Sequence, residues 1–289
     1  MKIVKNSKNV GYAGGNYIGM LYARGELIAI LNPDVVVDKN WLDELVKVLI
    51  RNSRIGLVTP LILYYNKPLL VNAAGNSVHF TGLSFCRGYK KSVALFNKNE
   101  TILAPSGAAF LVKREVIKKI GLMKPYFFMD FADIDFAVNA ALSGYDCLLV
   151  VTSKVFHKFV FKLSPWRLYI LERGRYLFLK DILDSKTLSI LLLPLFVTEI
   201  ISFLYAIIKG KEYLVAKIKS LKYFPIKGSR KNTMARRYYN LLRKMTYNVE
   251  IYDEMIKNNI LRKIIETSLN NIYKLIYKMT LFTISILNL

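Results

Sequence analysis

The sequence is poor in cysteine, histidine and acidic residues. Its 289 residues include two cysteines, Cys86 and Cys147, and two histidines, His79 and His157. Two cysteines are too few for a disulfide framework or a cysteine-rich zinc site, and two histidines exclude a multi-histidine metal centre. Asp and Glu number 20 against 43 Lys and Arg, so the formal net charge is +23. Such a chain is expected to bind an anionic partner: a nucleic acid, an anionic substrate or an anionic membrane surface.

The apolar content is high, at 53% of the chain, which excludes global disorder despite the charge. Residues 188–208 carry a single charge, Glu199, and a strongly basic stretch follows at 209–244. This apolar run is long enough for a membrane-spanning helix, but Glu199 and Pro194 count against a simple lipid-exposed span. We therefore consider two alternatives, a membrane-embedded or interfacial helix and a buried helix of a soluble core.

The N-terminal residues contain no long apolar segment of the kind found in secretory signal peptides. We therefore expect the chain on the cytoplasmic side of the cell membrane, where a polybasic segment beside an apolar helix would meet anionic lipid. The expected attachment is peripheral or through one membrane-embedded helix.

The first 160 residues alternate between strand-like and helix-like runs. Strands are expected at 27–31, 55–63 and 147–151, and residues 103–113 are expected to form a small-residue turn that enters a strand. Helices are expected at 38–51, 114–120 and 132–143. This alternation predicts an α/β sheet with helices on its faces. After about residue 165 the pattern is helical and apolar. The expected domains are an α/β domain over residues 1–165 and a helical, basic, membrane-associated region over residues 166–289.

Two polar motifs lie early in the chain. Residues 9–16, with the sequence NVGYAGGN, hold three glycines and two asparagines, so their backbone can approach a ligand closely and donate N–H groups. The alternative is a glycine-rich turn before a helix. Asn32-Pro33-Asp34 follows an apolar strand, where α/β folds place ligand-binding side chains. The Asp34 carboxylate suits a Mg²⁺ or Mn²⁺ ion on a diphosphate, and the alternative is a turn residue that caps the next helix.

Two further motifs lie later in the chain. Asp130, Asp133 and Asp135 are three carboxylates within six residues among aromatic side chains, an arrangement that is costly unless it is solvated or functional. One of them could act as a general base toward a hydroxyl nucleophile. Alternatively, Asp133 and Asp135 form the acidic first turn of a helix. His157 follows a strand-like run. A lone histidine is more often structural than a ligand, and the position past a strand end adds some support to a functional role.

In this order and spacing, the motifs resemble glycosyltransferase family 2, especially its rhamnosyltransferase-like branch. The residues that carry the resemblance are Asn9, Gly11, Gly15, Asn16, Leu31-Asn32-Pro33-Asp34, Gly107-Ala108 with Arg114, Phe127-Phe128, Asp133-Ile134-Asp135, Gly144-Tyr145 and His157. The resemblance spans about residues 3–175. It implies a GT-A fold, a nucleotide-sugar donor and a divalent metal ion, Mg²⁺ or Mn²⁺.

The resemblance also implies roles for individual residues. Asp34 is expected to bind the metal, and Asp133 is expected to deprotonate the acceptor hydroxyl. His157 is expected near the diphosphate, and Gly107 and Ala108 are expected to line the sugar pocket. The remaining residues expected to bind the nucleotide sugar are Asn9, Gly11, Gly15, Asn16 and Asn32. The implied reaction is an inverting, metal-assisted transfer of a sugar to a glycan or lipid-linked acceptor at the membrane.

The sequence departs from the family pattern at two places. The chain begins just before the glycine-rich motif, so we expect the family's N-terminal strand–helix units to be missing or to be supplied by a second chain. In addition, Ala132 replaces the glutamate that usually precedes Asp133, Lys124-Pro125 replaces an acidic pair, and Asn139 replaces an arginine.

These departures leave an alternative function open, in which a degenerate, inactive relative serves as a binding or scaffold subunit. A basic nucleic-acid-binding protein is a weaker alternative. No nucleic-acid-binding motif is visible in the sequence, and the acidic residues at 130–135 would repel phosphate. The expected partners are therefore the nucleotide sugar, the acceptor and an anionic membrane, without a nucleic acid.

Overall fold

The computed structural model describes residues 3–159, 161–229 and 235–286. The chain divides into two compact units. The α/β unit comprises Met1–Ser77 and Cys86–Val160, and the helical unit comprises Val78–Phe85 and Phe161–Leu289. The predicted fold class, an α/β sheet followed by a helical region, is confirmed. The grouping of residues 78–85 with the later helices was not predicted from the sequence.

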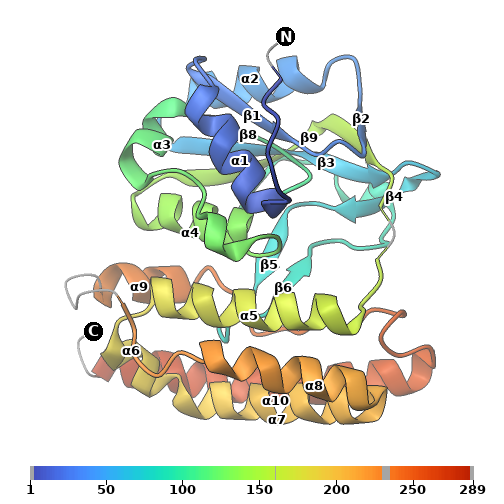
Figure 1. The fold of residues 1–289 in the computed structure, drawn as a ribbon, viewed down its shortest axis with the longest axis vertical. Coiled ribbons are helices and arrows are strands. Elements are labelled where there is room, and N and C mark those ends of the chain that lie inside the picture. Colours follow the sequence, from blue (N-terminus) through green and yellow to red (C-terminus); the bar gives the residue numbers. More distant parts are fainter. Residues whose placement is uncertain (1–2, 160, 230–234, 287–289) are drawn as a thin grey trace. The chain divides into compact units, whose positions relative to one another are not determined.

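The α/β unit alternates helices and strands (Figure 1). Its helices are α1 (Gly11–Tyr22), α2 (Trp41–Arg51), α3 (Arg114–Ile120) and α4 (Ala132–Leu142), with short 3₁₀ turns at Val93–Leu95 and Pro125–Phe127. Its main sheet contains β1 (Leu27–Leu31), β2 (Val35–Val37), β3 (Ile55–Tyr64), β4 (Lys67–Ala73), β7 (Glu100–Ile102), β8 (Ala109–Lys113) and β9 (Asp146–His157). A separate hairpin pairs β5 (Asn76–Val78) with β6 (Ser84–Cys86).

The topology of the main sheet brings several strand ends to one edge. The strand order is β1-β8-β3-β9-β2, with β4 paired to β3 and β7 paired to β9. β3 and β9 are parallel, β8 runs antiparallel to β1 and β3, and β2 runs antiparallel to β9. Consequently β1, β3 and β9 end at the same edge, where β2 and β8 begin. We call this the C-terminal edge, and it is the usual position of ligand sites in α/β folds.

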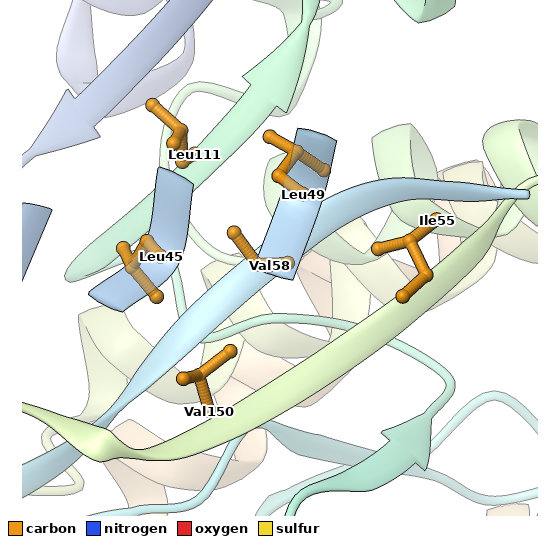
Figure 2. Close-up of a cluster of buried hydrophobic side chains, with 6 residues drawn as sticks. All are labelled: Leu45, Leu49, Ile55, Val58, Leu111 and Val150. Carbon is orange, nitrogen blue, oxygen red and sulfur yellow. The ribbon is translucent and has the colours of Figure 1, made fainter. Parts of the chain in front are cut away.

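Helix α2 covers part of this sheet because its apolar residues recur at helical spacing. Leu45 and Leu49 are one turn apart, so both point to the same side of the helix. They pack against Val58 of β3, Leu111 of β8 and Val150 of β9 (Figure 2). Both leucines are fully buried. This core holds the central strands in register and so fixes the C-terminal edge.

The helical unit contains α5 (Pro165–Ile182), α6 (Ser185–Ile190), α7 (Leu192–Lys209), α8 (Lys211–Ser220), α9 (Ala235–Leu242) and α10 (Asn259–Ile286), with a 3₁₀ turn at Leu221–Tyr223. Several helix ends are encoded locally. The Asp184 carboxylate accepts a hydrogen bond from the Thr187 amide at 2.7 Å and caps α6. Gly210, with φ of +110°, lies between α7 and α8 in a conformation that favours glycine. Figure 1 shows α5 and α9 in one layer of this unit and α7, α8 and α10 in another.

The apolar run at 188–208, considered as one helix from the sequence, is divided between two helices. α6 ends at Ile190 and α7 begins at Leu192. Pro194 therefore lies in the first turn of α7, where its missing N–H breaks no helical hydrogen bond. Among the residues that the structure describes, α7 is the helix long and apolar enough to cross a membrane, by length and composition alone.

The tip of the β5–β6 hairpin is buried among the helices of its unit. His79 is fully buried, its Nε2–H donates to the Tyr247 carbonyl at 3.2 Å, and its ring lies 4.6 Å from that of Tyr273. Burial lowers the pKa of His79 to about 3, so the ring is neutral. The Thr198 hydroxyl of α7 donates to that of Thr81 at 3.1 Å. His79 is thus a structural residue of the helical unit.

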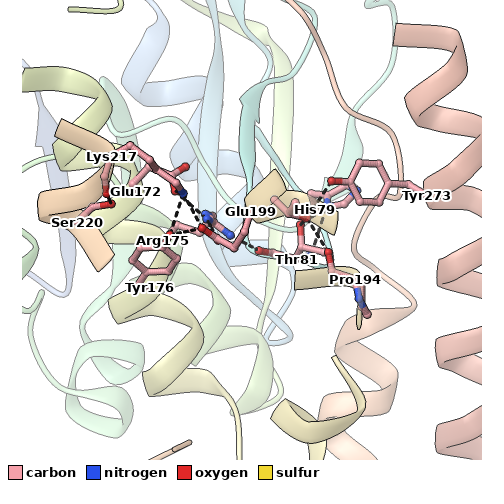
Figure 3. A network of polar contacts seen from close by, with 11 residues as sticks. His79, Thr81, Glu172, Arg175, Tyr176, Pro194, Glu199, Lys217, Ser220 and Tyr273 are labelled. Atoms are coloured by element: carbon pink, nitrogen blue, oxygen red, sulfur yellow. Dashed lines mark hydrogen bonds and ion pairs between the residues drawn. The ribbon is translucent and has the colours of Figure 1, made fainter. Parts of the chain in front are cut away.

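A buried ionic network joins three helices (Figure 3). Arg175 of α5 and Lys217 of α8 each pair with Glu172 of α5 and with Glu199 of α7. The Tyr176 hydroxyl also donates to Glu199 at 2.6 Å. Burial tends to raise the pKa of Glu172, but the charges of Arg175 and Lys217 outweigh it and hold that pKa at about 2. Glu199, the one charge of the apolar run, therefore points into the unit.

Candidate active site

A first polar cluster lies at the C-terminal edge of the sheet. Asp34 occupies the turn between β1 and β2, and His157 is the last residue of β9. His157 Nε2 lies 3.2 Å from Asp34 Oδ1, and His157 Nδ1 lies 3.0 Å from Asn72 Oδ1 of β4. The Asp34 side chain is 48% exposed, whereas that of His157 is 8% exposed. The predicted metal ligand and the predicted diphosphate neighbour are thus adjacent, with the carboxylate open to solvent.

The hydrogen bond to Asn72 decides how the His157 ring is protonated. The amide oxygen of Asn72 can only accept a hydrogen bond. His157 Nδ1 is therefore protonated and donates to Asn72 Oδ1 at 3.0 Å. Burial lowers the pKa of His157 more than the nearby Asp34 carboxylate raises it, which favours the neutral ring. The neutral ring then directs its Nε2 lone pair toward Asp34 Oδ1. Two acceptor atoms 3.2 Å apart are stabilised by a cation or proton between them.

A second cluster surrounds Asp133 in the first turn of α4. Its carboxylate is buried, accepts a hydrogen bond from Asn76 Nδ2 at 3.1 Å, and is bonded by the backbone N–H of Gly107. Burial, followed by the charge of Asp130, raises the pKa of Asp133 to about 6. Near neutral pH this group is ionised but binds a proton more readily than an ordinary aspartate does. These are the properties required of a general base.

Gly107 and Tyr12 enclose the Asp133 carboxylate. A Cβ atom at position 107 would lie 2.9 Å from Asp133 Oδ2 and 2.9 Å from the Tyr12 hydroxyl, so only glycine fits without displacement. The Tyr12 hydroxyl is buried and has no hydrogen-bond partner in the part of the chain that the structure describes. Burial and the Asp133 charge raise the pKa of Tyr12 well above its ordinary value, so the hydroxyl stays protonated. It is therefore available to donate a hydrogen bond to a ligand.

The two clusters border one chain segment. The backbone N–H of Asn32 donates to the Ala108 carbonyl at 2.9 Å, and the adjacent Gly107 bonds Asp133. Asn32 is the first residue after β1 and precedes Asp34 by two residues. Ala108 is the last residue before β8. The structure thus brings six predicted residues to one edge of the sheet: Asn32, Asp34, Gly107, Ala108, Asp133 and His157.

The glycine-rich motif forms the beginning of helix α1. Asn9 Oδ1 accepts from the Gly11 amide at 2.9 Å, and Asn16 Nδ2 donates to the Tyr12 carbonyl at 2.9 Å. Gly11 has φ of +70°, and an added Cβ would clash with the Phe128 carbonyl oxygen. The alternative considered from the sequence was a glycine-rich turn before a helix, and the structure places Gly11 to Asn16 within α1 itself. A Cβ added at Gly15 would meet no atom within 4 Å, so this glycine leaves open space beside the helix.

Three polar residues of the two clusters were not selected from the sequence. Tyr12 lies inside the glycine-rich motif, and the role of its buried hydroxyl depends on contacts with distant residues such as Asp133. Asn72 and Asn76 belong to strands that carry no recognisable motif. Their partners are 85 and 57 residues away in the chain, so the fold alone brings them to the site.

No convergence of three or more His, Cys, Asp or Glu side chains suited to a metal ion occurs within residues 3–159, 161–229 and 235–286. Asp34 and His157 supply two donor atoms. A divalent ion here would need further oxygen ligands from water or from a bound phosphate group.

Comparison with known proteins gives a family match in the same region. Residues 1–121 match the model of glycosyl transferase family 2. The uncharacterized protein y4gI of Sinorhizobium fredii is 22% identical over 163 residues, which cover 54% of this chain and 18% of that protein. The low-salt glycan biosynthesis hexosyltransferase Agl10 of Haloferax volcanii is 26% identical over 144 residues, which cover 47% of this chain and 45% of that protein. The aligned part thus spans less than half of either relative.

Two solved structures are also similar. GalNAc-T7 with UDP, GalNAc and Mn²⁺ has a TM-score of 0.47 at 19% identity, covering 60% of this chain and 36% of that one. The mannosyltransferase PcManGT from Pyrobaculum calidifontis, in complex with GDP-Man and Mn²⁺, has a TM-score of 0.44 at 14% identity, covering 97% and 69%. The family match includes every predicted site residue up to Ala108, whereas Asp133 and His157 lie beyond it. The match over residues 1–121, in an α/β unit with the expected motif order, shows that this part of the chain is similar to glycosyl transferase family 2.

Proposed function

We propose that the α/β unit transfers a sugar from a nucleotide-diphospho-sugar to a hydroxyl group of a glycan or lipid-linked acceptor. The observation that carries this proposal is Asp133, a buried carboxylate whose pKa is raised to about 6 and which lies on the same edge of the sheet as Asp34 and His157. The family match and the relative named as a glycan biosynthesis hexosyltransferase support a sugar as the transferred group.

In the proposed reaction Asp133 accepts the proton of the acceptor hydroxyl as the hydroxyl oxygen forms a bond to the anomeric carbon of the donor. The bond from that carbon to the diphosphate breaks, and the nucleoside diphosphate leaves with the electron pair. Attack from the face opposite the leaving group inverts the configuration. Asn76, at 3.1 Å, and the Gly107 amide hold the carboxylate in position, and the free Tyr12 hydroxyl is placed to bond the sugar or the acceptor.

Asp34 and His157 fit a divalent cation because two acceptor atoms face each other at 3.2 Å and the carboxylate is about half exposed. Mg²⁺ and Mn²⁺ are commonly held by one or two carboxylates together with substrate phosphates. When bound, such an ion neutralises negative charge on the leaving diphosphate. Asn72 would orient the His157 ring through its contact with Nδ1.

We also propose that the protein works at a membrane, on its cytoplasmic side. Besides α7, helix α10 exposes apolar side chains at Ile272, Leu275, Met279 and Phe282, all more than two-fifths exposed. Exposed lysines at 263, 274 and 278 lie on the same helix. Exposed apolar side chains beside lysines are typical of helices that bind anionic lipid surfaces.

Donor binding tests the role of Asp34 directly. Calorimetric titration of the full chain with UDP-, GDP- and dTDP-sugars, with and without Mn²⁺, is expected to show metal-dependent binding of at least one donor. Asp34→Ala should remove the metal-dependent part of the affinity, because it removes one of the two donor atoms. Asp43→Ala, which removes an exposed carboxylate from α2, is the matched control and should bind as the wild type does. Unchanged metal dependence in Asp34→Ala would reject this assignment.

A further inference from the structure

Helices α7 and α8 present one outer face of unusual composition. Every exposed residue of α7 from Leu192 to Ile208 is apolar: Leu192, Leu193, Phe196, Ile200, Leu204, Ile207 and Ile208. They recur every three or four residues and so form one stripe along the helix. The polar residues Thr198 and Glu199 point the other way, into the unit. The helix therefore turns apolar side chains outward and polar side chains inward, the reverse of a surface helix in a water-soluble protein.

Helix α8 continues this face. Lys217 of α8 and Glu199 of α7 form an ion pair with each other, and each also pairs with a residue of α5 (Figure 3). The sides of α7 and α8 that carry these two residues therefore both face α5. Their outer sides consequently face the same way. The outer side of α8 exposes Val215 and Ile218. We call the exposed apolar residues of both helices the α7–α8 outer face.

Exposed lysines accompany the α7–α8 outer face. Lys209 ends α7, Lys211 begins α8, and Lys219 and Lys222 follow near the other end of α8. The exposed acidic residue of this helix pair is Glu212. An apolar stripe with cationic surroundings is complementary to a bilayer that contains anionic lipid. The same lysines would oppose self-association of two copies through this face.

The buried network determines how α7 can meet a bilayer. With 18 residues, α7 is about 27 Å long, close to the thickness of the hydrocarbon core. However, Glu199 near its middle is bonded to Arg175 and Lys217. If α7 crossed the bilayer, Arg175 and Lys217 would have to move to the bilayer centre with Glu199, or Glu199 would lose both ion pairs. Either change costs free energy. The network is undisturbed if α7 lies parallel to the surface.

We propose that the α7–α8 outer face binds an anionic lipid bilayer in the plane of its interface, with α7 parallel to the membrane and not crossing it. This deepens the membrane association proposed above. It requires no donor or acceptor, so it can be tested independently of the transferase activity.

Flotation of the full chain with vesicles tests the binding. Protein should float with phosphatidylcholine–phosphatidylglycerol vesicles and much less with phosphatidylcholine alone. Changing Phe196, Ile200 and Leu204 to serine should weaken binding about tenfold or more per side chain, because each loses its apolar burial in lipid. The matched control removes three exposed apolar side chains from the α/β unit, Ile3→Ser, Leu69→Ser and Leu95→Ser, and should float as the wild type does. Absence of flotation by the wild type, or equal flotation of both triple variants, would overturn the proposal.

Neutralising lysines tests the choice of lipid. Each change of Lys209, Lys211, Lys219 or Lys222 to Gln should lower affinity for the anionic vesicles about fivefold. Four exposed lysines of the α/β unit, Lys39, Lys67, Lys98 and Lys118, changed to Gln serve as the control for total charge. An equal loss in both sets would show general charge attraction and contradict this face as the binding surface. Dimerisation through the face, detected by sedimentation without flotation, would also overturn the proposal.

Insertion depth separates an in-plane helix from a spanning one. Cys86→Ser leaves Cys147, which is buried with its thiol pKa raised by that burial and so is unreactive. Fluorophores on Leu193→Cys, Ile200→Cys and Ile207→Cys should be quenched equally by lipids that carry shallow nitroxides. In a spanning helix, position 200 would lie about 10 Å deeper than the other two. That depth pattern would overturn the in-plane arrangement.

Discussion

At the scale of single residues, the proposed chemistry depends on Asp133 being buried but not neutralised. Burial and the charge of Asp130 raise its pKa, and backbone N–H groups, including that of Gly107, partly offset the rise. Lys124 of the same region pairs instead with Asp135, at 2.9 Å. The two neighbouring carboxylates therefore have different surroundings: that of Asp135 is paired with a lysine, whereas that of Asp133 faces Tyr12 and Gly107.

Gly107→Ala tests how closely the Asp133 carboxylate is enclosed. The new Cβ would lie 2.9 Å from both Asp133 Oδ2 and the Tyr12 hydroxyl, so it should displace the carboxylate and lower sugar transfer at least tenfold. Gly19→Ala is the matched control, since an added Cβ there meets no atom within 4 Å. That change should leave transfer unchanged and stabilise α1 by about 0.5–1 kcal/mol. Equal activity of the two variants, measured as initial rates, would contradict the enclosure.

Sequence motifs indicated some residues of the site and missed others for a physical reason. Asp34 and Asp133 stand out because a carboxylate after a buried strand or among aromatic residues is unusual. Asn72 and Asn76 are ordinary strand residues, and only the pairing of strands and loops brings them to His157 and Asp133. Such long-range contacts depend on sheet register, which local patterns do not determine.

At the scale of secondary structure, some predicted bounds are correct and others are not: β9 spans Asp146–His157 where a strand was expected at 147–151, and β4 was not expected. The strand at 27–31 and the helix at 114–120 have the predicted bounds, and the helix expected at 38–51 begins at Trp41. The strands β2, β5, β6 and β7 are three residues long, too short for a hydrophobic period to show. The hairpin tip at 78–85 could not be assigned to the helical unit because its burial depends on partners more than 90 residues later, such as Arg175 and Thr198.

The buried network should dominate the stability of the helical unit. Lys217→Met removes one cation from a pair of buried carboxylates, Glu172 and Glu199, and should lower the free energy of unfolding by about 3–5 kcal/mol. Lys219→Met, two residues along the same helix and exposed, should change it by less than about 0.5 kcal/mol. Denaturant unfolding followed by circular dichroism measures both. A similar stability for the two variants would mean that the network contributes little.

At the scale of the whole molecule, the excess positive charge and the exposed apolar stripes are both concentrated in the helical unit. Residues 151–289 carry 25 of the 43 basic residues, and the helical unit exposes apolar stripes on α7 and α10. The α/β unit carries the family match and the carboxylates of the proposed site. This division agrees with the two proposals above, in which the helical unit holds the protein at anionic lipid and the α/β unit transfers the sugar.

The most direct test of this account measures donor cleavage by the full chain on anionic vesicles, with Mn²⁺ and the nucleotide sugars that bind. Release of nucleoside diphosphate, to water or to added acceptors, should rise with pH through about 6, because only ionised Asp133 can accept a proton. Asp133→Asn should lower the rate about 10²–10⁴-fold while donor binding and circular dichroism stay unchanged. A rate in Asp133→Asn equal to that of the wild type would contradict Asp133 as the base. Donor binding without release at any pH would instead identify a binding subunit and contradict the transferase.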